Sequence, residues 1–226
     1  MIRTLPACLL ILVCFFAPFL AKSQDLNLIG RLNVGIGLDY ISQDFNGIKT
    51  FFSPGGGLGL EAGLEGELPN DLYWYGTLGF TQSLNLHFEE VNGQTRKTAF
   101  GWNKKIILGG VNRYFEIRNR YIPNVFAGAG AQLAFPGKLR RTENNDYKGR
   151  IYYNPAVGFH LEGGATFDIV NRFLIRPSVR YRFIQYNARK YSKGDVSTLR
   201  PDLKKAFGGG IDISVTLVKQ IKGGRR

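Results

Sequence analysis

His160 and Glu162 are the residues of this sequence whose types and spacing come nearest to a catalytic arrangement. They are two residues apart, so on a β-strand both side chains would lie on one face. A histidine oriented by a carboxylate can act as general base for a hydroxyl nucleophile, and Ser178 is a nominal candidate for that role. No His-x-Ser pair accompanies either His160 or the other histidine, His87. An interior histidine satisfied by a carboxylate is therefore the preferred interpretation.

Metal, thiol and nucleotide chemistry are not indicated by the sequence. Both cysteines, Cys8 and Cys14, fall in the first 23 residues, and the remaining acids and histidines show no metal-ligand spacing. The glycine triplets at 55–57 and 208–210 precede predicted strands, whereas a phosphate-binding loop leads into a helix. We therefore expect no metal site and no cofactor.

An acidic set and a basic set have spacings of two or four residues, so each would lie on one face of a strand. The acidic set is Glu61, Glu65 and Glu67, and the basic set is Arg176, Arg180 and Arg182. Guanidinium–carboxylate pairs can satisfy both partners bidentately, so we expect the two sets to reach across to each other. Together with His160 and Glu162 they form the predicted interior charge cluster.

Two polar segments, 136–150 and 187–204, each carry a net charge of +3. The basic residues that we select from them are Lys138, Arg140, Arg141, Lys148, Arg150, Arg189, Lys190 and Lys193. Lysine and arginine pair well with phosphate groups, so these segments could contact an anionic partner. Solvated loops without a specific ligand are the commoner case.

Strict apolar–polar alternation, which is typical of β-strands, recurs throughout the chain after Gln24. The predicted strands are 28–42, 58–68, 72–88, 98–112, 121–135, 151–167, 173–186 and 205–218. Connections 69–71 and 168–172 are tight. The longer, polar connections are 43–54, 89–97, 136–150 and 187–204, with the hairpin-type pairs Asn46-Gly47 and Asn92-Gly93 in two of them. The chain is therefore predicted to be all-β with one domain.

The first 23 residues have the pattern of an export signal. Arg3 precedes a 13-residue apolar stretch, 8–20, and small residues stand three and one positions before Gln24. The stretch is too short to span a bilayer. We predict a signal peptide at 1–23 and a single domain at 24–226. Loss of Arg3 and Lys22 leaves 28 basic against 17 acidic residues, which changes the net charge from +13 to +11.

Alternation does not say which face of the sheet is inside. A soluble barrel points its apolar face inward, whereas an outer-membrane barrel points it towards lipid. Many of the 29 glycines fall on the polar face, as a narrow lumen requires. Large aromatic residues stand on the apolar face, as interfacial girdles do, and the polar-face charges balance. These patterns favour a closed eight-stranded antiparallel up-and-down transmembrane β-barrel over a solvated soluble one.

The aromatic girdle and the balanced lumenal charges are predicted at specific residues. The predicted girdle consists of Tyr40, Trp74, Phe100, Trp102, Tyr121, Phe135, Tyr153, Phe173, Tyr181 and Phe183. The charges assigned to the lumen are Asp39, Glu61, Glu65, Glu67, Glu162, Asp168, Arg31, Lys105, Arg113, Arg176, Arg180 and Arg182.

The mature chain resembles the small outer-membrane β-barrels common in Bacteroidetes, which are related in architecture to OmpA-type and OmpX-type barrels. The resemblance rests on the stretches YIPNVFAGAG (121–130), RPSVRYRF (176–183) and GGGIDISVTL (208–217). Gly210, Ile213 and Val215 match the spacing of the family's assembly signal, whereas the basic end at 221–226 replaces its usual terminal aromatic residue. The resemblance implies a lipid-embedded barrel, assembled by the barrel-assembly machinery.

We therefore expect an outer-membrane barrel, exported through the periplasm, that is not an enzyme and does not bind nucleic acid. Its lumen would be plugged by side chains, and it would act in envelope structure or surface interaction through basic outer loops. Its partners would be outer-membrane lipid, including lipopolysaccharide phosphates, and an envelope protein complex. Two alternatives remain open. One is an accessory barrel of a secretion or surface-assembly machine, as PorT-like relatives are, and the other is a lipid A-modifying enzyme using His160.

Overall fold

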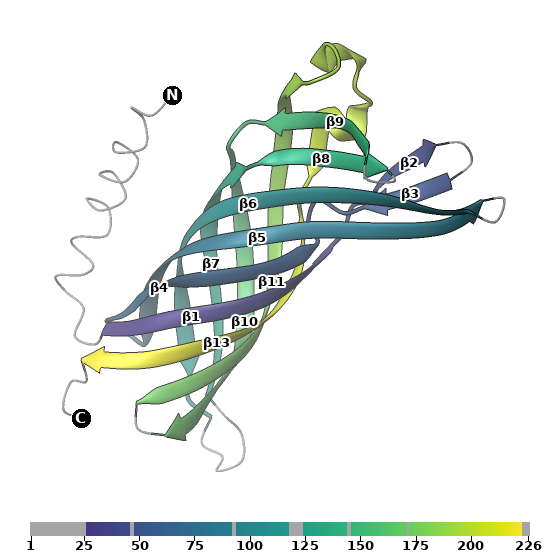
Figure 1. Cartoon of the computed structure of the whole chain (residues 1–226). Helices are drawn as coiled ribbons and strands as arrows, with labels where there is room; N and C mark the ends of the chain where they lie inside the picture. The colour runs from purple at the N-terminus through teal and green to yellow at the C-terminus, as the bar shows by residue number, and fades with distance from the viewer. Residues whose placement is uncertain are drawn as a thin grey trace.

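Hydrogen-bonded strands run through most of the chain in the computed structural model, which describes residues 26–45, 48–91, 94–117, 124–143, 146–170 and 172–222 (Figure 1). The predicted signal peptide at 1–23 lies outside these residues, as do Tyr121 and the pairs at 46–47 and 92–93. The side chains of His87, Arg141 and Lys148 also lie outside the described part, although their strands belong to it.

Eight long strands form a barrel wall. They are β1 (Leu26–Gly37), β4 (Gly57–Leu68), β5 (Leu72–Val91), β6 (Gln94–Phe115), β7 (Asn124–Pro136), β10 (Ala156–Val170), β11 (Phe173–Tyr191) and β13 (Gly210–Lys222). Each pairs antiparallel with the next strand along the chain, and β13 pairs with β1 to close the sheet. This pairing confirms the predicted closed eight-stranded up-and-down barrel.

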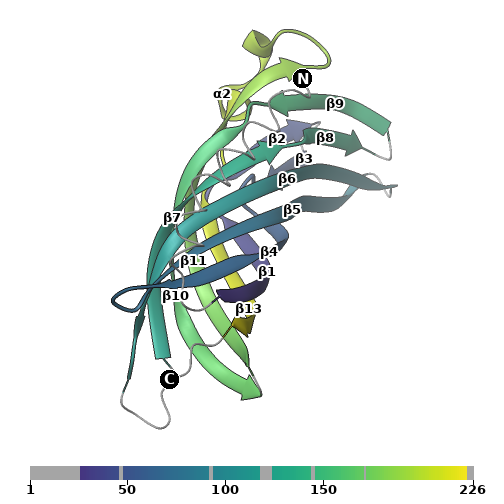
Figure 2. The ribbon, with the colours of Figure 1, turned by 90° about the vertical axis from the view of Figure 1, so that its left-hand side faces the viewer.

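Shorter elements extend the wall at one end. The hairpin of β8 (Lys138–Glu143) and β9 (Asp146–Tyr153) continues beyond β7 and β10 and pairs with β6 and β11 (Figure 2). β2 (Ile41–Phe45) and β3 (Ile48–Phe52) form a separate hairpin. Between β11 and β13 lie the 3-10 helix η1 (Val196–Thr198), α2 (Pro201–Lys204) and β12 (Lys205–Phe207). Paired strands thus occupy most of the segments predicted as loops, because backbone hydrogen bonds do not require apolar side chains.

The two ends of the barrel differ. The turn from β4 to β5 at 69–71 lies at the end opposite the hairpins, where Leu26 also pairs with Lys222 (Figure 1). In outer-membrane barrels the short turns face the periplasm and the longer connections face outward. On this basis the end with the short turns is the periplasmic end, and the end with β8 and β9 is the extracellular end.

An apolar band covers the outer surface of the wall. Leu60, Val157 and Phe159 leave 63%, 67% and 65% of their surface exposed. Neighbouring exposed residues include Leu28, Leu32, Val34, Ile36, Leu58, Leu78, Leu161, Val179, Ile213, Val215 and Leu217. Apolar area of this extent is unfavourable in water and favourable in lipid. Among the described residues, no helix is long and apolar enough to cross a bilayer. The predicted inversion, with the apolar face outward, is confirmed.

One strand was predicted with its faces reversed. Phe100, Trp102, Ile106 and Leu108 of β6 are buried inside the barrel, whereas Lys105 and Arg113, which we assigned to the lumen, are exposed on the outside. The segment has apolar residues in both phases and two adjacent lysines, so its alternation is ambiguous. A slip of one residue then exchanges the two faces. Asp168, also assigned to the lumen, is exposed as well.

The predicted strand 151–167 is divided at Asn154 and Pro155. Before this break Tyr153 points inward and is 2% exposed, and after it Val157 points towards lipid. The break changes the phase of the alternation, so the apolar residues on its two sides do not share a face. The pattern seemed continuous in the sequence because both halves place apolar residues at odd positions.

The aromatic girdle is smaller than predicted. Tyr40, Phe173, Tyr181 and Phe183 are exposed on the outside, at 56%, 37%, 41% and 53%. Trp74, Phe100, Trp102 and Tyr153 are buried instead, at 4%, 2%, 0% and 2%. Phe135 is half-buried. Aromatic residues are as suited to the interior of the barrel as to its lipid boundary, so residue type alone did not separate them.

The buried aromatic residues form an apolar plug in the extracellular half of the barrel. Trp102 lies at its centre, with ring centroids 4.9 Å from those of Tyr153 and Tyr186 and 6.1 Å from that of Phe52. The Tyr153 hydroxyl donates to the Leu203 carbonyl at 3.0 Å, and burial raises the pKa of this phenol well above its ordinary value. The plug fills the space between the β8–β9 extension and the β2–β3 hairpin.

Candidate functional site in the lumen

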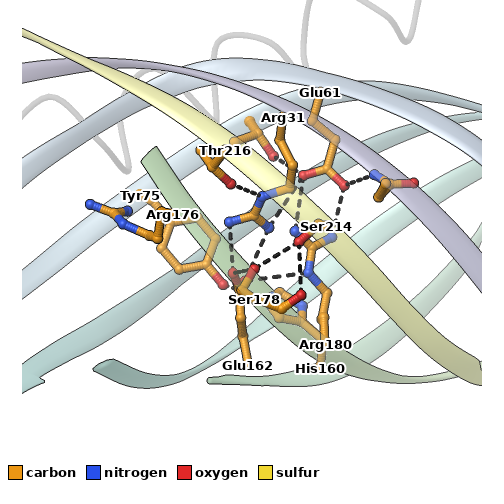
Figure 3. Close-up of polar contacts among 12 residues, drawn as sticks. Arg31, Glu61, Tyr75, His160, Glu162, Arg176, Ser178, Arg180, Ser214 and Thr216 are labelled. Atoms are coloured by element: carbon orange, nitrogen blue, oxygen red, sulfur yellow. Dashed lines mark hydrogen bonds and ion pairs between the residues drawn. The ribbon is translucent and has the colours of Figure 1, made fainter. Parts of the chain in front are cut away.

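Four charged side chains form a closed ring in the barrel interior, which we call the tetrad: Arg31 (β1), Glu61 (β4), Glu162 (β10) and Arg180 (β11) (Figure 3). Arg31 donates to both Glu162 oxygens, at 3.0 and 2.7 Å, and lies 3.6 Å from Glu61. Arg180 donates to both Glu61 oxygens, at 2.8 and 3.0 Å, and its Nε lies 3.3 Å from Glu162. Each carboxylate thus contacts both guanidinium groups, and the charges cancel.

Neutral groups complete the hydrogen bonding of the tetrad. Thr216 accepts from Arg31 Nε at 2.8 Å, Asn33 donates to Glu61 at 2.9 Å, and Ser178 donates to Glu162 at 2.9 Å. All four tetrad residues are less than 9% exposed. Burying charges costs several kcal/mol per ion, and only good geometry and additional hydrogen bonds offset that cost. The tetrad meets both conditions.

A separate pair lies nearer the periplasmic end. Arg176 donates to both oxygens of Glu65, at 2.7 and 3.1 Å, and the same carboxylate accepts from Asn27 at 3.3 Å. The Arg176 guanidinium also lies 5.1 Å from the Tyr114 ring centroid and 5.3 Å from that of Phe126. Aromatic faces of this kind attract a desolvated cation. The pair therefore occupies part of the lumen below the tetrad.

The third arginine of the predicted cluster has a partner from outside the predicted acidic set. Arg182 pairs with Asp212 of β13, at 2.6 and 2.7 Å, and donates to the Gly55 carbonyl at 2.8 Å. β4 and β11 run in opposite directions, so residues nearer the end of β4 face residues nearer the start of β11. Glu67 lies half-buried near the periplasmic end, far along the strands from Arg182.

Segment 52–56 enters the barrel above these pairs. Lys104 Nζ donates to the Pro54 carbonyl at 2.6 Å and lies 5.1 Å from the Trp102 ring centroid. Ser83 donates a short hydrogen bond to the Gly56 carbonyl. Lys104 is 1% exposed. The segment thus joins the charged lower lumen to the apolar plug, and its backbone carbonyls bind two buried cations, Lys104 and Arg182.

His160 is buried in the lumen, at 2% exposed, but its neighbours differ from those that the sequence suggested. Its Nε2 makes a short hydrogen bond with the Tyr75 hydroxyl. Ser178 shares its hydrogen bonds with Glu162 and with Ser214, at 2.9 and 2.7 Å. The structure therefore does not show the arrangement considered from the sequence, in which Glu162 orients His160 and His160 contacts Ser178. Among the described residues, no group of three or more His, Cys, Asp or Glu side chains could hold a metal ion.

Sequence reasoning missed some lumenal residues from the charge cluster. Arg31 was assigned to the lumen but not to the cluster, although it contacts both tetrad acids. Asp212 stood on the polar face of the last predicted strand, so its alternation could have identified it. Lys104 could not be identified, because the faces of its strand were reversed. Tyr75 gave no signal, because nothing in the sequence distinguished it from other aromatic residues.

The lumen is narrow enough that a single methyl group should matter. A Cβ atom at Gly130 would stand 2.3 Å from the Gly109 carbonyl oxygen and 2.7 Å from the His160 ring, whereas one at Gly30 would have no atom within 4 Å. Overpacking of a filled interior costs about 1–3 kcal/mol. We expect Gly130→Ala to lower the urea midpoint for unfolding in lipid vesicles and Gly30→Ala to leave it nearly unchanged. Equal midpoints for the two variants would contradict a filled lumen.

The basic residues selected from the outer segments lie at the extracellular end. Lys138, Arg140, Arg189, Lys190 and Lys193 are exposed, and Arg150 is half-buried. They are positioned by paired strands instead of loose loops, apart from Lys193, which follows β11. Arg141 lies in β8 and Lys148 in β9, both with side chains outside the described part.

The sequence matches no family model and no curated protein. Solved structures with a similar backbone arrangement include Neisserial surface protein A. It has 9% sequence identity, the match covers 86% of this chain and 96% of that protein's chain, and the TM-score is 0.47. Ail, the attachment invasion locus protein of Yersinia pestis, has 14% identity over 88% and 98%, with a TM-score of 0.41. AlkL, an outer membrane protein, has 13% identity over 90% and 93%, with a TM-score of 0.38.

At these identities and scores the similarities carry no argument about what this chain does. Its class follows from its own structure. The sheet is closed, the outer surface is apolar, and buried ion pairs lie in the interior. Closed sheets satisfy every backbone group in lipid, and polar interiors behind apolar surfaces are the pattern of outer-membrane barrels. The protein is an outer-membrane β-barrel.

Proposed function

We propose that this barrel is a non-conducting structural protein of the outer membrane that acts in envelope integrity or in surface interaction through its extracellular end. The observation that supports a closed lumen is its continuous filling. The Arg176–Glu65 pair, the tetrad, the Arg182–Asp212 pair and the aromatic plug follow one another from the periplasmic to the extracellular end. A general diffusion pore needs an open aqueous channel instead.

Interaction at the cell surface is supported by the β8–β9 extension. It carries the wall beyond the apolar band and presents Lys138 and Arg140 on paired strands. A surface held on strands is better ordered than one on loops, which suits recognition of a partner.

Lipid modification using His160 is not favoured. An acyl chain or lipid phosphate would have to reach a side chain that lies inside the wall, between Tyr75 and the tetrad. An accessory role in a secretion or surface-assembly machine has no particular observation in its favour. Co-purification with a large envelope complex would support it.

A conductance measurement tests the closed lumen. The refolded barrel, shown by its heat-dependent shift on a gel to be folded, is inserted into planar lipid bilayers and recorded under voltage. We expect no steady open level, because ion pairs and aromatic side chains fill the lumen. A steady large conductance from the same preparation would contradict the proposal.

A further inference from the structure

One buried cation of the barrel has no buried carboxylate to balance it. Among the described residues, the buried acids are Glu61, Glu65, Glu162 and Asp212, and the buried bases are Arg31, Lys104, Arg176, Arg180 and Arg182. Each of these carboxylates forms an ion pair with an arginine, whereas Lys104 forms no ion pair with any described residue. The buried interior therefore carries one uncompensated positive charge, which belongs to Lys104.

The protein satisfies the Lys104 ammonium group only in part. An ammonium group has three donors, and one of them binds the Pro54 carbonyl at 2.6 Å. Its other neighbours are the rings of Trp102 and Tyr186, whose centroids lie 5.1 and 6.0 Å from Nζ. Burying an ion costs several kcal/mol unless a partner and further hydrogen bonds offset the cost. A charged residue inside a membrane protein with so little compensation is typical of a binding site.

Two more wall side chains donate to the same stretch of backbone as Lys104. Arg182 of β11 donates to the Gly55 carbonyl at 2.8 Å, and Ser83 of β5 donates to the Gly56 carbonyl. With Lys104 of β6, donors from three wall strands converge on three successive carbonyl oxygens. Donors that converge in this way also suit the oxygens of an anion, and an anion would cancel the buried charge as well.

Segment 52–56 presents an aromatic ring to the wall together with these oxygens. Phe52 is fully buried, and its ring centroid lies 5.4 Å from that of Phe100 and 6.1 Å from that of Trp102. Trp102 is also the ring over which Lys104 Nζ lies. The segment thus places an aromatic group and an oxygen acceptor side by side in the lumen. A small aromatic acid offers the same two groups.

Segment 52–56 is attached so that its release leaves the wall intact. β2 and β3 precede it and pair with each other, and among the described residues neither pairs with a wall strand. Gly57, which follows it, has a φ of 142°, a conformation that favours glycine. The wall holds the segment through donors on side chains, and the ladder between β1 and β4 does not include it. Outward movement of the segment therefore breaks no wall ladder.

We propose that Lys104 is the centre of a binding site for a small carboxylate with an aromatic group, and that segment 52–56 covers this site when the ligand is absent. The ligand carboxylate replaces the Pro54 carbonyl on Lys104, and its ring replaces Phe52 against Trp102. A carboxylate supplies the single negative charge that the buried interior lacks. The site lies above the tetrad, which stays in place, so the proposal goes beyond the closed lumen and does not depend on it.

The test uses Ser53→Cys in the refolded barrel in nanodiscs and measures its rate of reaction with a water-soluble maleimide. Ser53 is 6% exposed, so the reaction should be slow without ligand. Hydrocinnamate, an aromatic ring joined to a carboxylate by a short chain, should raise the rate about tenfold at saturation, because it binds only when segment 52–56 is displaced. Hydrocinnamamide, which lacks the charge, and acetate, which lacks the ring, should leave the rate nearly unchanged.

Two adjacent lysines provide the matched variants. Lys104→Met should abolish both the faster labelling and the binding of hydrocinnamate measured by calorimetry. Lys105→Met, which removes an exposed lysine from the outer face, should keep both. The heat-dependent gel shift shows whether each variant is folded. If Lys104→Met does not fold, the comparison of hydrocinnamate with hydrocinnamamide on the natural Lys104 still decides the proposal.

Absence of hydrocinnamate binding, or binding that persists in Lys104→Met, would overturn the proposed site. An equal response to hydrocinnamamide would overturn the need for an anion, and binding without faster labelling would overturn the covering role of segment 52–56. These failures are distinguishable from failure of the closed-lumen proposal, because the conductance recording uses the natural sequence without ligand.

Discussion

Replacement of Arg180 by methionine is expected to lower the free energy of unfolding by about 3–5 kcal/mol, because it leaves Glu61 and Glu162 buried with one guanidinium group between them. Arg31 cannot replace the lost contacts, since it already donates to both oxygens of Glu162. Urea titration of the barrel in lipid vesicles, followed by tryptophan fluorescence, measures the change.

Two matched variants show whether the loss of stability comes from a buried carboxylate left without its partner. Arg189→Met removes an exposed arginine from the same strand and should change the stability by less than about 0.5 kcal/mol. The double variant Arg176→Met/Glu65→Leu removes both members of a pair and should cost much less than Arg180→Met, because no unpaired ion remains and only neutral hydrogen bonds such as that from Asn27 are lost. A loss below about 1 kcal/mol for Arg180→Met would contradict the tetrad.

The second large effect is expected from Trp102→Ala in the aromatic plug, with a loss of about 3–5 kcal/mol. Trp102 is fully buried between Phe52, Tyr153 and Tyr186, and Lys104 lies over its ring. These neighbours come from four separate elements, so they cannot all close in on the cavity that alanine would leave. The same urea titration, followed by circular dichroism, measures the loss.

Trp102→Phe serves as the control for this substitution. It keeps an aromatic ring but removes the hydrogen bond from Nε1 to the Gly137 carbonyl, which is 3.1 Å long. A net cost of about 1 kcal/mol is expected for that bond, with a smaller addition for the lost ring area. If Trp102→Ala and Trp102→Phe were equally stable, Trp102 would not be packed in a core.

The barrel could be predicted from the sequence because eight alternating segments and short turns leave few other closed arrangements. Where the alternation was clear, as in β1 and β4, the faces were also predicted correctly: Leu32 and Leu60 are exposed, and Arg31 and Glu61 are buried. The prediction of faces failed in β6, where Lys104 and Lys105 are adjacent and both phases of the alternation contain large apolar residues. The extracellular plug also differs from the prediction that polar side chains face the lumen, because large aromatic side chains occupy the lumen at this end of the barrel.

The charge cluster could be predicted only as a set. Alternation placed Glu61 and Arg180 on lumenal faces. It could not predict that they pair with each other, because the register between strands that are not neighbours along the chain is set by the closure of the barrel. Arg182 therefore pairs with Asp212, which the predicted acidic set did not include. His160 lies in the interior, where its Nε2 makes a hydrogen bond with Tyr75 instead of with the carboxylate that we expected.

The central claim is that the apolar face meets lipid, and a spin-label measurement tests it most directly. The only two cysteines, Cys8 and Cys14, lie in the predicted signal peptide, so a single cysteine introduced after it gives a unique label. Labels at Leu60→Cys and Phe159→Cys in lipid vesicles should be accessible to oxygen, which concentrates in hydrocarbon, and protected from a water-soluble nickel complex. A label at Arg189→Cys should show the reverse. Nickel accessibility at Leu60 and Phe159 equal to that at Arg189 would contradict the lipid-facing barrel.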